Sequence, residues 1–163
     1  MHAFMMGPTV QLDEAIRLAA GQYHRLVILA GSPGSGKTAT LRSISKSNDC
    51  PLVNVNLELS RRMLELSRVQ RPRQVERLLK DVIAALPGDL VLLDNLEILF
   101  DATLEVEPLR LLQATSRNRT VVASWNGTFK DGTLAYAEPG HPEFAQFKQA
   151  EAVVITAAEL PRN

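Results

Sequence analysis

The chain has 163 residues, which is enough for one domain with a buried core but too few for two full-sized domains. Hydrophobic residues make up 45% of the sequence, and this fraction excludes an intrinsically disordered protein. The formal net charge is zero, so the sequence as a whole does not indicate a surface built to coat a polyanion.

Two further features indicate a cytoplasmic protein. Cys50 is the only cysteine, so no internal disulfide can form, which favours a reducing compartment. The first seven residues lack the basic segment, apolar run and small-residue cleavage site of an export signal. The apolar stretches are strand-sized and too short to cross a membrane, so we expect no membrane association.

The predicted elements alternate between helices and strands. A helix is expected within residues 9–21, where apolar residues recur at helical spacing before a glycine. Short apolar runs predict strands at residues 26–30, 52–57, 90–94, 120–124 and 152–156. Further helices are expected at residues 37–47, 60–69 with Ser60 as the cap, 72–86 and 108–117. This order predicts an α/β fold of three layers, with a parallel five-stranded sheet between helices.

The segment between the first strand and the next helix matches the Walker A pattern in full, as GSPGSGKT. Its glycines allow a tight turn that aims backbone N–H groups at phosphate oxygens, and the helix start adds a partial positive charge. Lys37 is expected to reach the β- and γ-phosphates, and the Thr38 hydroxyl to bind Mg²⁺. A chance glycine loop is disfavoured by this strand-to-helix context. The expected nucleotide contacts are Gly31, Ser32, Pro33, Gly34, Ser35, Gly36, Lys37, Thr38 and Ala39.

The strand at 90–94 is four apolar residues followed by Asp94, the form of a Walker B strand. Asp94 is therefore a second candidate ligand for Mg²⁺; the alternative is an aspartate that caps a core strand. The spacing leaves room for the strand at 120–124 to lie between the two motif strands. That is the layout of AAA-type and RecA-type ATPases.

Polar residues around the end of the fourth strand are candidates for sensing the γ-phosphate, as in AAA-like ATPases. Asn126 is the first choice and Ser124 the second, although Asn126 and Gly127 could equally form a turn. Many hydrolysing relatives carry Glu directly after the Walker B aspartate, but here Asn95 stands there, and an amide cannot accept a proton as a carboxylate can. Glu97 is the candidate substitute base; the alternative is a solvated residue after the strand. Because position 95 carries no glutamate, hydrolysis is expected to be slow or to depend on a partner.

Charged residues are distributed unevenly along the chain. Residues 61–80 are rich in arginine, whereas the segment from Asp94 to Glu107 contains several acidic residues and no lysine or arginine. Two patches of opposite charge would suit head-to-tail association into a homo-oligomer. Alternatively, the basic segment would bind along the phosphates of DNA. Solvated helix faces with internal ion pairs are the third interpretation. The candidates for an arginine finger are Arg117, Arg119 and Lys148.

Asp131 and Gly132 stand between short alternating runs, which predicts a hairpin within an insertion at residues 126–141. The chain ends soon after the last strand, so no helical lid domain is expected. We therefore expect a single P-loop NTPase domain over residues 1–163, with an N-terminal helix and lead-in over residues 1–25.

Four segments together resemble the BrxF family, the small P-loop proteins of BREX phage-defence systems. They are the Walker A segment, LVLLDNLEILFD at 90–101, VVASWNG at 121–127 and YAEPGHPE at 136–143. The resemblance implies an ATP-linked accessory factor that acts with a DNA methyltransferase and other BREX proteins to exclude phage. By the same resemblance, Lys37, Thr38 and Asp94 are functional residues, with Asn126 as a further candidate.

The leading functional hypothesis is a Mg²⁺-dependent ATPase or an ATP-controlled assembly factor. A non-hydrolysing nucleotide-binding switch subunit is the alternative, which Asn95 supports. A small-molecule P-loop kinase is disfavoured by the Walker B spacing and by the lack of an arginine-rich lid segment.

Overall fold

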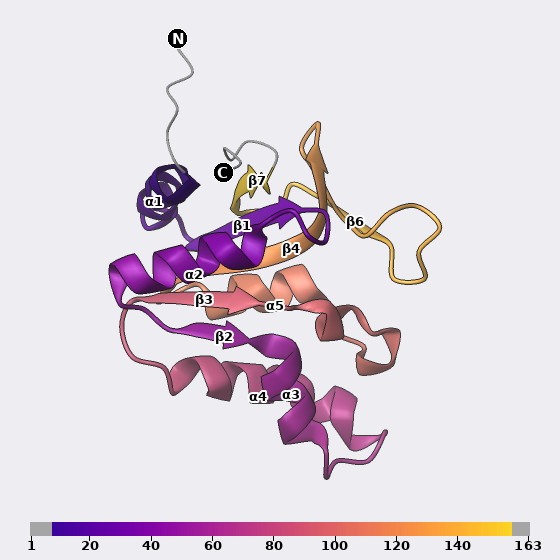
Figure 1. Cartoon of the computed structure of the whole chain (residues 1–163). Helices are drawn as coiled ribbons and strands as arrows, with labels where there is room; N and C mark the ends of the chain where they lie inside the picture. Colours follow the sequence, from indigo (N-terminus) through magenta and orange to yellow (C-terminus); the bar gives the residue numbers. More distant parts are fainter. Residues whose placement is uncertain (1–7, 158–163) are drawn as a thin grey trace.

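Five parallel strands in the order β2-β3-β4-β1-β7 form the central sheet of the computed structural model, which describes residues 8–157 (Figure 1). Their bounds are Leu26–Gly31 for β1, Leu52–Asn54 for β2, Leu90–Asp94 for β3, Thr120–Lys130 for β4 and Val153–Thr156 for β7. The predicted three-layer α/β fold is confirmed. β4 pairs with β1 on one side and with β3 on the other, so it separates the two motif strands as expected.

Helices cover both faces of the sheet, in keeping with strands that are apolar on both sides. One face packs on α1 (Pro8–Ala19) and α2 (Lys37–Asn48), and the other on α3 (Val55–Met63), α4 (Gln70–Ala84) and α5 (Pro108–Thr115). In β1, Val27 and Leu29 belong to the first core, whereas Ile28 belongs to the second, because side chains alternate along a strand. The lead-in before residue 8 lies outside the described residues. No helix of the described part is long and apolar enough to span a membrane.

The predicted strand at 52–57 and the helix starts after it are wrong in detail. β2 ends at Asn54, whose side chain accepts a hydrogen bond from the Leu57 amide at 3.0 Å and so caps α3. Ser60 therefore lies inside α3 rather than at its start. α4 begins two residues before the predicted Pro72, where Ser67 and Gln70 exchange side-chain-to-backbone hydrogen bonds in a capping box. Asparagine is a preferred helix cap, and this preference overrides the strand-like alternation of the segment.

The predicted hairpin is present, but it grows from a longer strand than expected. β4 continues past the predicted end at Ser124 to Lys130 and pairs antiparallel with β5 (Thr133–Tyr136), which pairs with β6 (Ala145–Lys148). Asp131 and Gly132 both have positive φ, 50° and 78°, as a tight turn of this kind requires. Asn126 and Gly127 lie within β4, so they do not form the alternative turn.

Aromatic side chains fix the base of this hairpin to the sheet. Trp125 is 1% exposed, and its indole N–H donates to the carbonyl oxygen of Ala135 at 3.0 Å. The rings of Phe100 and Tyr136 stack at 3.4 Å between centroids, and both meet the Trp125 ring edge-on. Trp125 is thus a core residue, which holds β5 against β4 beside Asn126.

The close packing at Gly127 leads to the first testable prediction. A Cβ at this position would lie 1.8 Å from the backbone oxygen of Ala135. Gly127→Ala must separate β4 from β5, and we expect it to lower the free energy of unfolding by about 3 kcal/mol. Urea denaturation followed by circular dichroism measures the change.

Gly21→Ala is the matched control. The nearest atom to its added Cβ is a backbone oxygen at 3.8 Å, an ordinary contact. We expect a change of less than about 1 kcal/mol. Equal stability of the two variants would contradict the close approach at Gly127.

Candidate nucleotide-binding site

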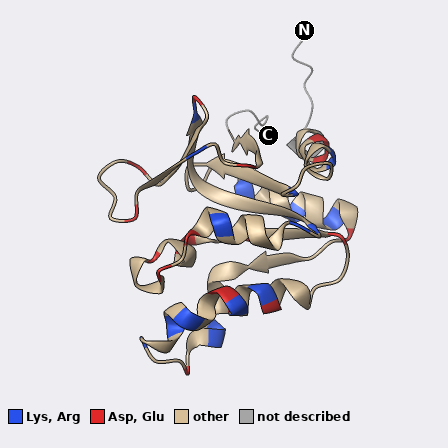
Figure 2. Cartoon of the chain, turned by 180° about the vertical axis from the view of Figure 1, so that it is seen from behind, with Lys and Arg blue, Asp and Glu red and all other residues tan. Residues whose placement is uncertain are grey.

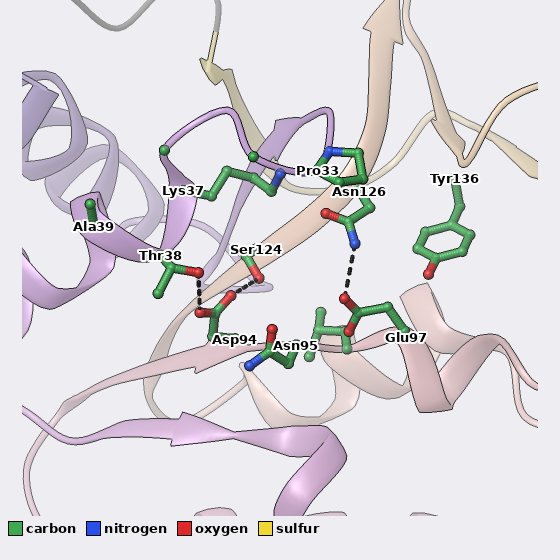
Figure 3. A pocket seen from close by; sticks show the side chains of 13 residues that line it. Pro33, Lys37, Thr38, Ala39, Asp94, Asn95, Glu97, Ser124, Asn126 and Tyr136 are labelled. Atoms are coloured by element: carbon green, nitrogen blue, oxygen red, sulfur yellow. Dashed lines mark hydrogen bonds between the residues drawn. The ribbon is translucent and has the colours of Figure 1, made fainter. Parts of the chain in front are cut away.

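A cavity of about 390 Å³ opens at the carboxyl ends of the parallel strands, where open α/β sheets bind their ligands. Its walls are the glycine loop after β1, the end of β3 with the turn that follows, and the end of the sheet portion of β4 (Figure 3). The three motifs that were predicted separately from the sequence therefore meet around one space.

The glycine loop has the backbone geometry that its sequence requires. Gly34 and Gly36 adopt positive φ, 80° and 96°, which is a conformation that side chains other than glycine rarely tolerate. Gly31 has no space for a side chain, because a Cβ there would lie 2.6 Å from atoms of Ser35 and Ala157. α2 begins directly at Lys37, so its N-terminal amides and partial positive charge face the cavity.

Lys37 is 6% exposed and lies along the loop with its ammonium group at the cavity. The ammonium donates to the carbonyl oxygens of Gly31 and Ser32 at 2.9 and 2.7 Å, and to the Ser35 hydroxyl at 3.3 Å. Burial lowers the pKa of Lys37, and the nearby carboxylates of Asp94 and Glu97 oppose that shift. A phosphate chain in the cavity would supply the negative charge that favours the ammonium form.

Asp94 joins the two motifs at the sheet edge. Its Oδ2 accepts a hydrogen bond from the Thr38 hydroxyl at 2.7 Å, and its Oδ1 accepts one from the Ser124 hydroxyl at 2.6 Å. The three oxygen-bearing side chains suit Mg²⁺, which binds to proteins through one or two carboxylates and takes its other ligands from phosphates and water. The residues present therefore fit a magnesium ion held by Thr38 and Asp94.

Glu97 reaches the same cavity, although it lies two residues beyond the usual position of the catalytic acid. Asn95 has a left-handed backbone, with φ 55°, and this turn leads into the short 3₁₀ helix η1 (Glu97–Phe100). Asn126 donates from its amide to one oxygen of Glu97 at 3.0 Å, and Asn56 donates to the other at 3.2 Å. The structure thus brings together Glu97 and Asn126, which were predicted separately as a substitute base and a γ-phosphate sensor.

Asn56 and Tyr136 also belong to this part of the molecule, and the sequence analysis did not identify them. Asn56 is fixed at the start of α3, because its side-chain oxygen accepts the Ile98 amide at 2.7 Å while its own backbone amide donates to Asn95. Tyr136 lines the cavity from β5. No local pattern marks Asn56 in the sequence, whereas Tyr136 is the first residue of the segment at 136–143 that contributes to the family resemblance.

The arginine-finger candidates lie elsewhere. The Arg119 guanidinium donates to the backbone oxygens of Ile83, Leu86 and Gly88, so it caps the end of α4 and is already engaged. Arg117 lies over the ring of Tyr23, 4.8 Å from its centroid. Lys148 is exposed at the end of β6.

The basic and acidic segments lie next to each other rather than on opposite sides of the chain (Figure 2). The second 3₁₀ helix after β3, η2 (Ala102–Leu104), packs against α4. Several of the basic residues also have acidic partners on their own helices; these pairs are Arg61 and Arg62 with Glu58, Arg77 with Asp81, and Lys80 with Glu76. This arrangement favours ion pairs within the chain over two separated patches.

Solved structures of other proteins are similar to this chain. A DNA replication initiation factor matches with a TM-score of 0.50 at 14% identity, over 94% of this chain and 47% of that one, which shows the fold alone. PCH-2 of C. elegans matches at 17% identity with a TM-score of 0.45, over 76% of this chain and 38% of that one. AMPPCP-bound DnaA from Aquifex aeolicus matches at 20% identity with a TM-score of 0.41, over 74% of this chain and 39% of that one. The chain spans less than half the length of these proteins.

No curated protein matches the sequence. The family model described as ATPase family associated with various cellular activities (AAA) matches residues 27–162, which include the glycine loop, β3 and the whole hairpin. This range covers most of the chain and all three walls of the cavity. The protein is therefore a member of the AAA family of ATPases, with a nucleotide-binding P-loop.

Proposed function

We propose that this chain binds Mg-ATP in the cavity and hydrolyses it slowly, with Glu97 as the group that orients the attacking water. The observation that carries the proposal is the position of the Glu97 carboxylate. The side-chain amides of Asn56 and Asn126 hold it in the lining of the cavity that also contains Lys37 and Asp94. A carboxylate there can accept a proton from water, which Asn95 cannot do.

The other residues have separate roles in this proposal. Lys37 and the loop amides hold the phosphates, and Thr38 and Asp94 hold Mg²⁺, which neutralises charge on the phosphate oxygens when it is bound. Ser124 keeps the Asp94 carboxylate oriented through its 2.6 Å hydrogen bond. Asn126, beside Glu97, is placed to contact the water or the γ-phosphate.

The contacts of Glu97 support slow turnover. Both of its oxygens accept hydrogen bonds from amides, which fix the orientation of the carboxylate and leave about two of its lone pairs for a water molecule. Turnover is therefore slow unless the carboxylate changes its orientation toward the attacking water. A partner that moves Asn56 or Asn126 would supply this change. If no such change occurs, the chain acts as a non-hydrolysing nucleotide switch, and the same two contacts favour that second candidate.

We also propose a role as an ATP-linked accessory factor in BREX phage defence. The support is the resemblance of four segments, and all four contribute residues to the nucleotide cavity or to the space beside it, among them Lys37, Glu97, Asn126 and His141. The proposed partners are other BREX proteins, further copies of the chain and DNA. For DNA, the exposed basic residues of segment 61–80 without a carboxylate partner among the described salt bridges are Arg68 and Arg73.

The first test concerns binding. Lys37→Ala removes the ammonium that lies at the cavity, and we expect the affinity for Mg-ATP to fall by about 3 kcal/mol or more, roughly a hundredfold. Isothermal titration calorimetry measures the change. Lys46→Ala, on the exposed surface of the same helix, is the control and should bind as the wild type does. Unchanged affinity in Lys37→Ala would remove the basis of the proposal.

The second test separates binding from hydrolysis. Glu97→Gln keeps the shape of the side chain but cannot accept a proton, so we expect phosphate release to fall about a hundredfold or more while ATP affinity is kept. Glu105→Gln changes an exposed acid after the same strand and should leave the rate unchanged. Full activity of Glu97→Gln would exclude Glu97 as the base. A wild type that binds ATP but releases no phosphate, alone or with DNA, would favour the switch.

The third test concerns assembly. If ATP bridges or orders neighbouring copies, the mass in solution should increase when Mg-ATP is added, as light scattering can measure. Lys37→Ala is the internal control and should not respond. A strictly monomeric wild type in both states would contradict self-association.

A further inference from the structure

The Tyr136 hydroxyl reaches the nucleotide cavity from the hairpin, on the same side as Glu97 and Asn126 (Figure 3). The residue is only 5% exposed, yet its hydroxyl makes no hydrogen bond with any other described side chain or backbone group. The hydroxyl is the part of the residue that reaches the cavity, so it can donate a hydrogen bond to whatever occupies this space. Tyr136 therefore has a free donor aimed at a space that holds a ligand.

The ring that carries this hydroxyl is held firmly. It stacks on Phe100 at an interplanar angle of 5°, and it meets the Trp125 ring edge-on, with 5.8 Å between the ring centroids. On the backbone, Tyr136 pairs with Gly127, and the next residue, Ala137, donates to the Asn126 carbonyl oxygen at 2.8 Å. The phenol oxygen is thus positioned by the same strand that carries Asn126, and it loses little freedom when it meets a ligand.

The hydroxyl is a donor at neutral pH. Burial, together with the negative charges of Glu97 and Glu143, raises the pKa of Tyr136 to about 12, so the phenol keeps its proton. The ligand atom that best suits this position is an anionic oxygen, since a charged acceptor makes the stronger hydrogen bond.

The location identifies which end of the nucleotide is concerned. Tyr136, Pro33, Glu97 and Asn126 line both the nucleotide cavity and a second cavity of about 790 Å³ beyond it. The ammonium of Lys37, which meets β- and γ-phosphates in a P-loop, lies at the same end, near Pro33. The shared wall is thus the terminal-phosphate end.

We propose that the Tyr136 hydroxyl donates a hydrogen bond to the terminal phosphate of bound ATP, so that the hairpin after β4 distinguishes a triphosphate from a diphosphate. This inference rests on the proposed binding of ATP in the cavity. It assigns the hairpin a role in the site, because the donor comes from β5 rather than from one of the parallel strands.

Tyr136→Phe tests the inference, because it removes a single oxygen and keeps the stacked ring. Calorimetric titration with the β,γ-methylene analogue of ATP, which is not hydrolysed, should show an affinity about tenfold lower than in the wild type. The affinity for ADP should change less than about twofold, since ADP has no phosphate at that end. The melting temperature checks that the variant is folded.

Tyr23→Phe is the matched control, because Tyr23 is the only other tyrosine and is exposed. It should bind both nucleotides as the wild type does. Unchanged affinity of Tyr136→Phe for the analogue, or an equal loss for the analogue and for ADP, would overturn the inference while leaving ATP binding intact. A wild type that binds neither nucleotide would overturn the proposed function and this inference together.

Discussion

The pairing of β4 between β1 and β3 is the constraint on which the site depends. Its register sets Gly31 beside Asn126 on one side and Leu93 beside Ala123 on the other. The glycine loop and Asp94 therefore lie at the same edge of the sheet, on either side of Ser124 and Asn126. A shift of β4 by one residue would turn Ser124 to the other face of the sheet and break its hydrogen bond to Asp94, because side chains alternate along a strand. The buried residues of β4 on both faces resist this shift.

The features of the fold and the site that could be predicted from the sequence are those set by residues close together in the chain. The glycine loop and the strand before Asp94 are set by contiguous residues, because a phosphate cradle needs its glycines, lysine and threonine at fixed offsets. The turn at Asp131 and Gly132 is local in the same way. Asn56 could not be assigned from the sequence, because its role depends on Glu97, 41 positions away. Tyr136 depends on Phe100 and Trp125, which the antiparallel return of the chain brings together.

Local signals also explain where the prediction was wrong. The alternation from Leu52 to Leu57 has the period of a strand, but Asn54 caps a helix, and a cap at this point ends β2 after three residues. Of the three interpretations of the charges, the salt bridges favour ion pairs within the chain. Counting residues 61–80 alone omits Glu58 and Asp81, which lie just outside and pair with Arg61, Arg62 and Arg77. Sequence windows divide helices at arbitrary points, whereas ion pairs follow the helix face.

The two unusual features of the site act in opposite directions. Both oxygens of Glu97 accept a hydrogen bond from an amide, so the orientation of this carboxylate is fixed by the protein. The Tyr136 hydroxyl, by contrast, faces the cavity and makes no hydrogen bond with another described residue. A terminal phosphate would satisfy the free donor without disturbing the carboxylate, so binding of ATP and its hydrolysis can be separate events. Both features are attached to β4, through the Asn126 side chain and through the backbone pairing of Gly127 with Tyr136. A partner that bends the hairpin would therefore act on the phosphate contact and on the base through one strand.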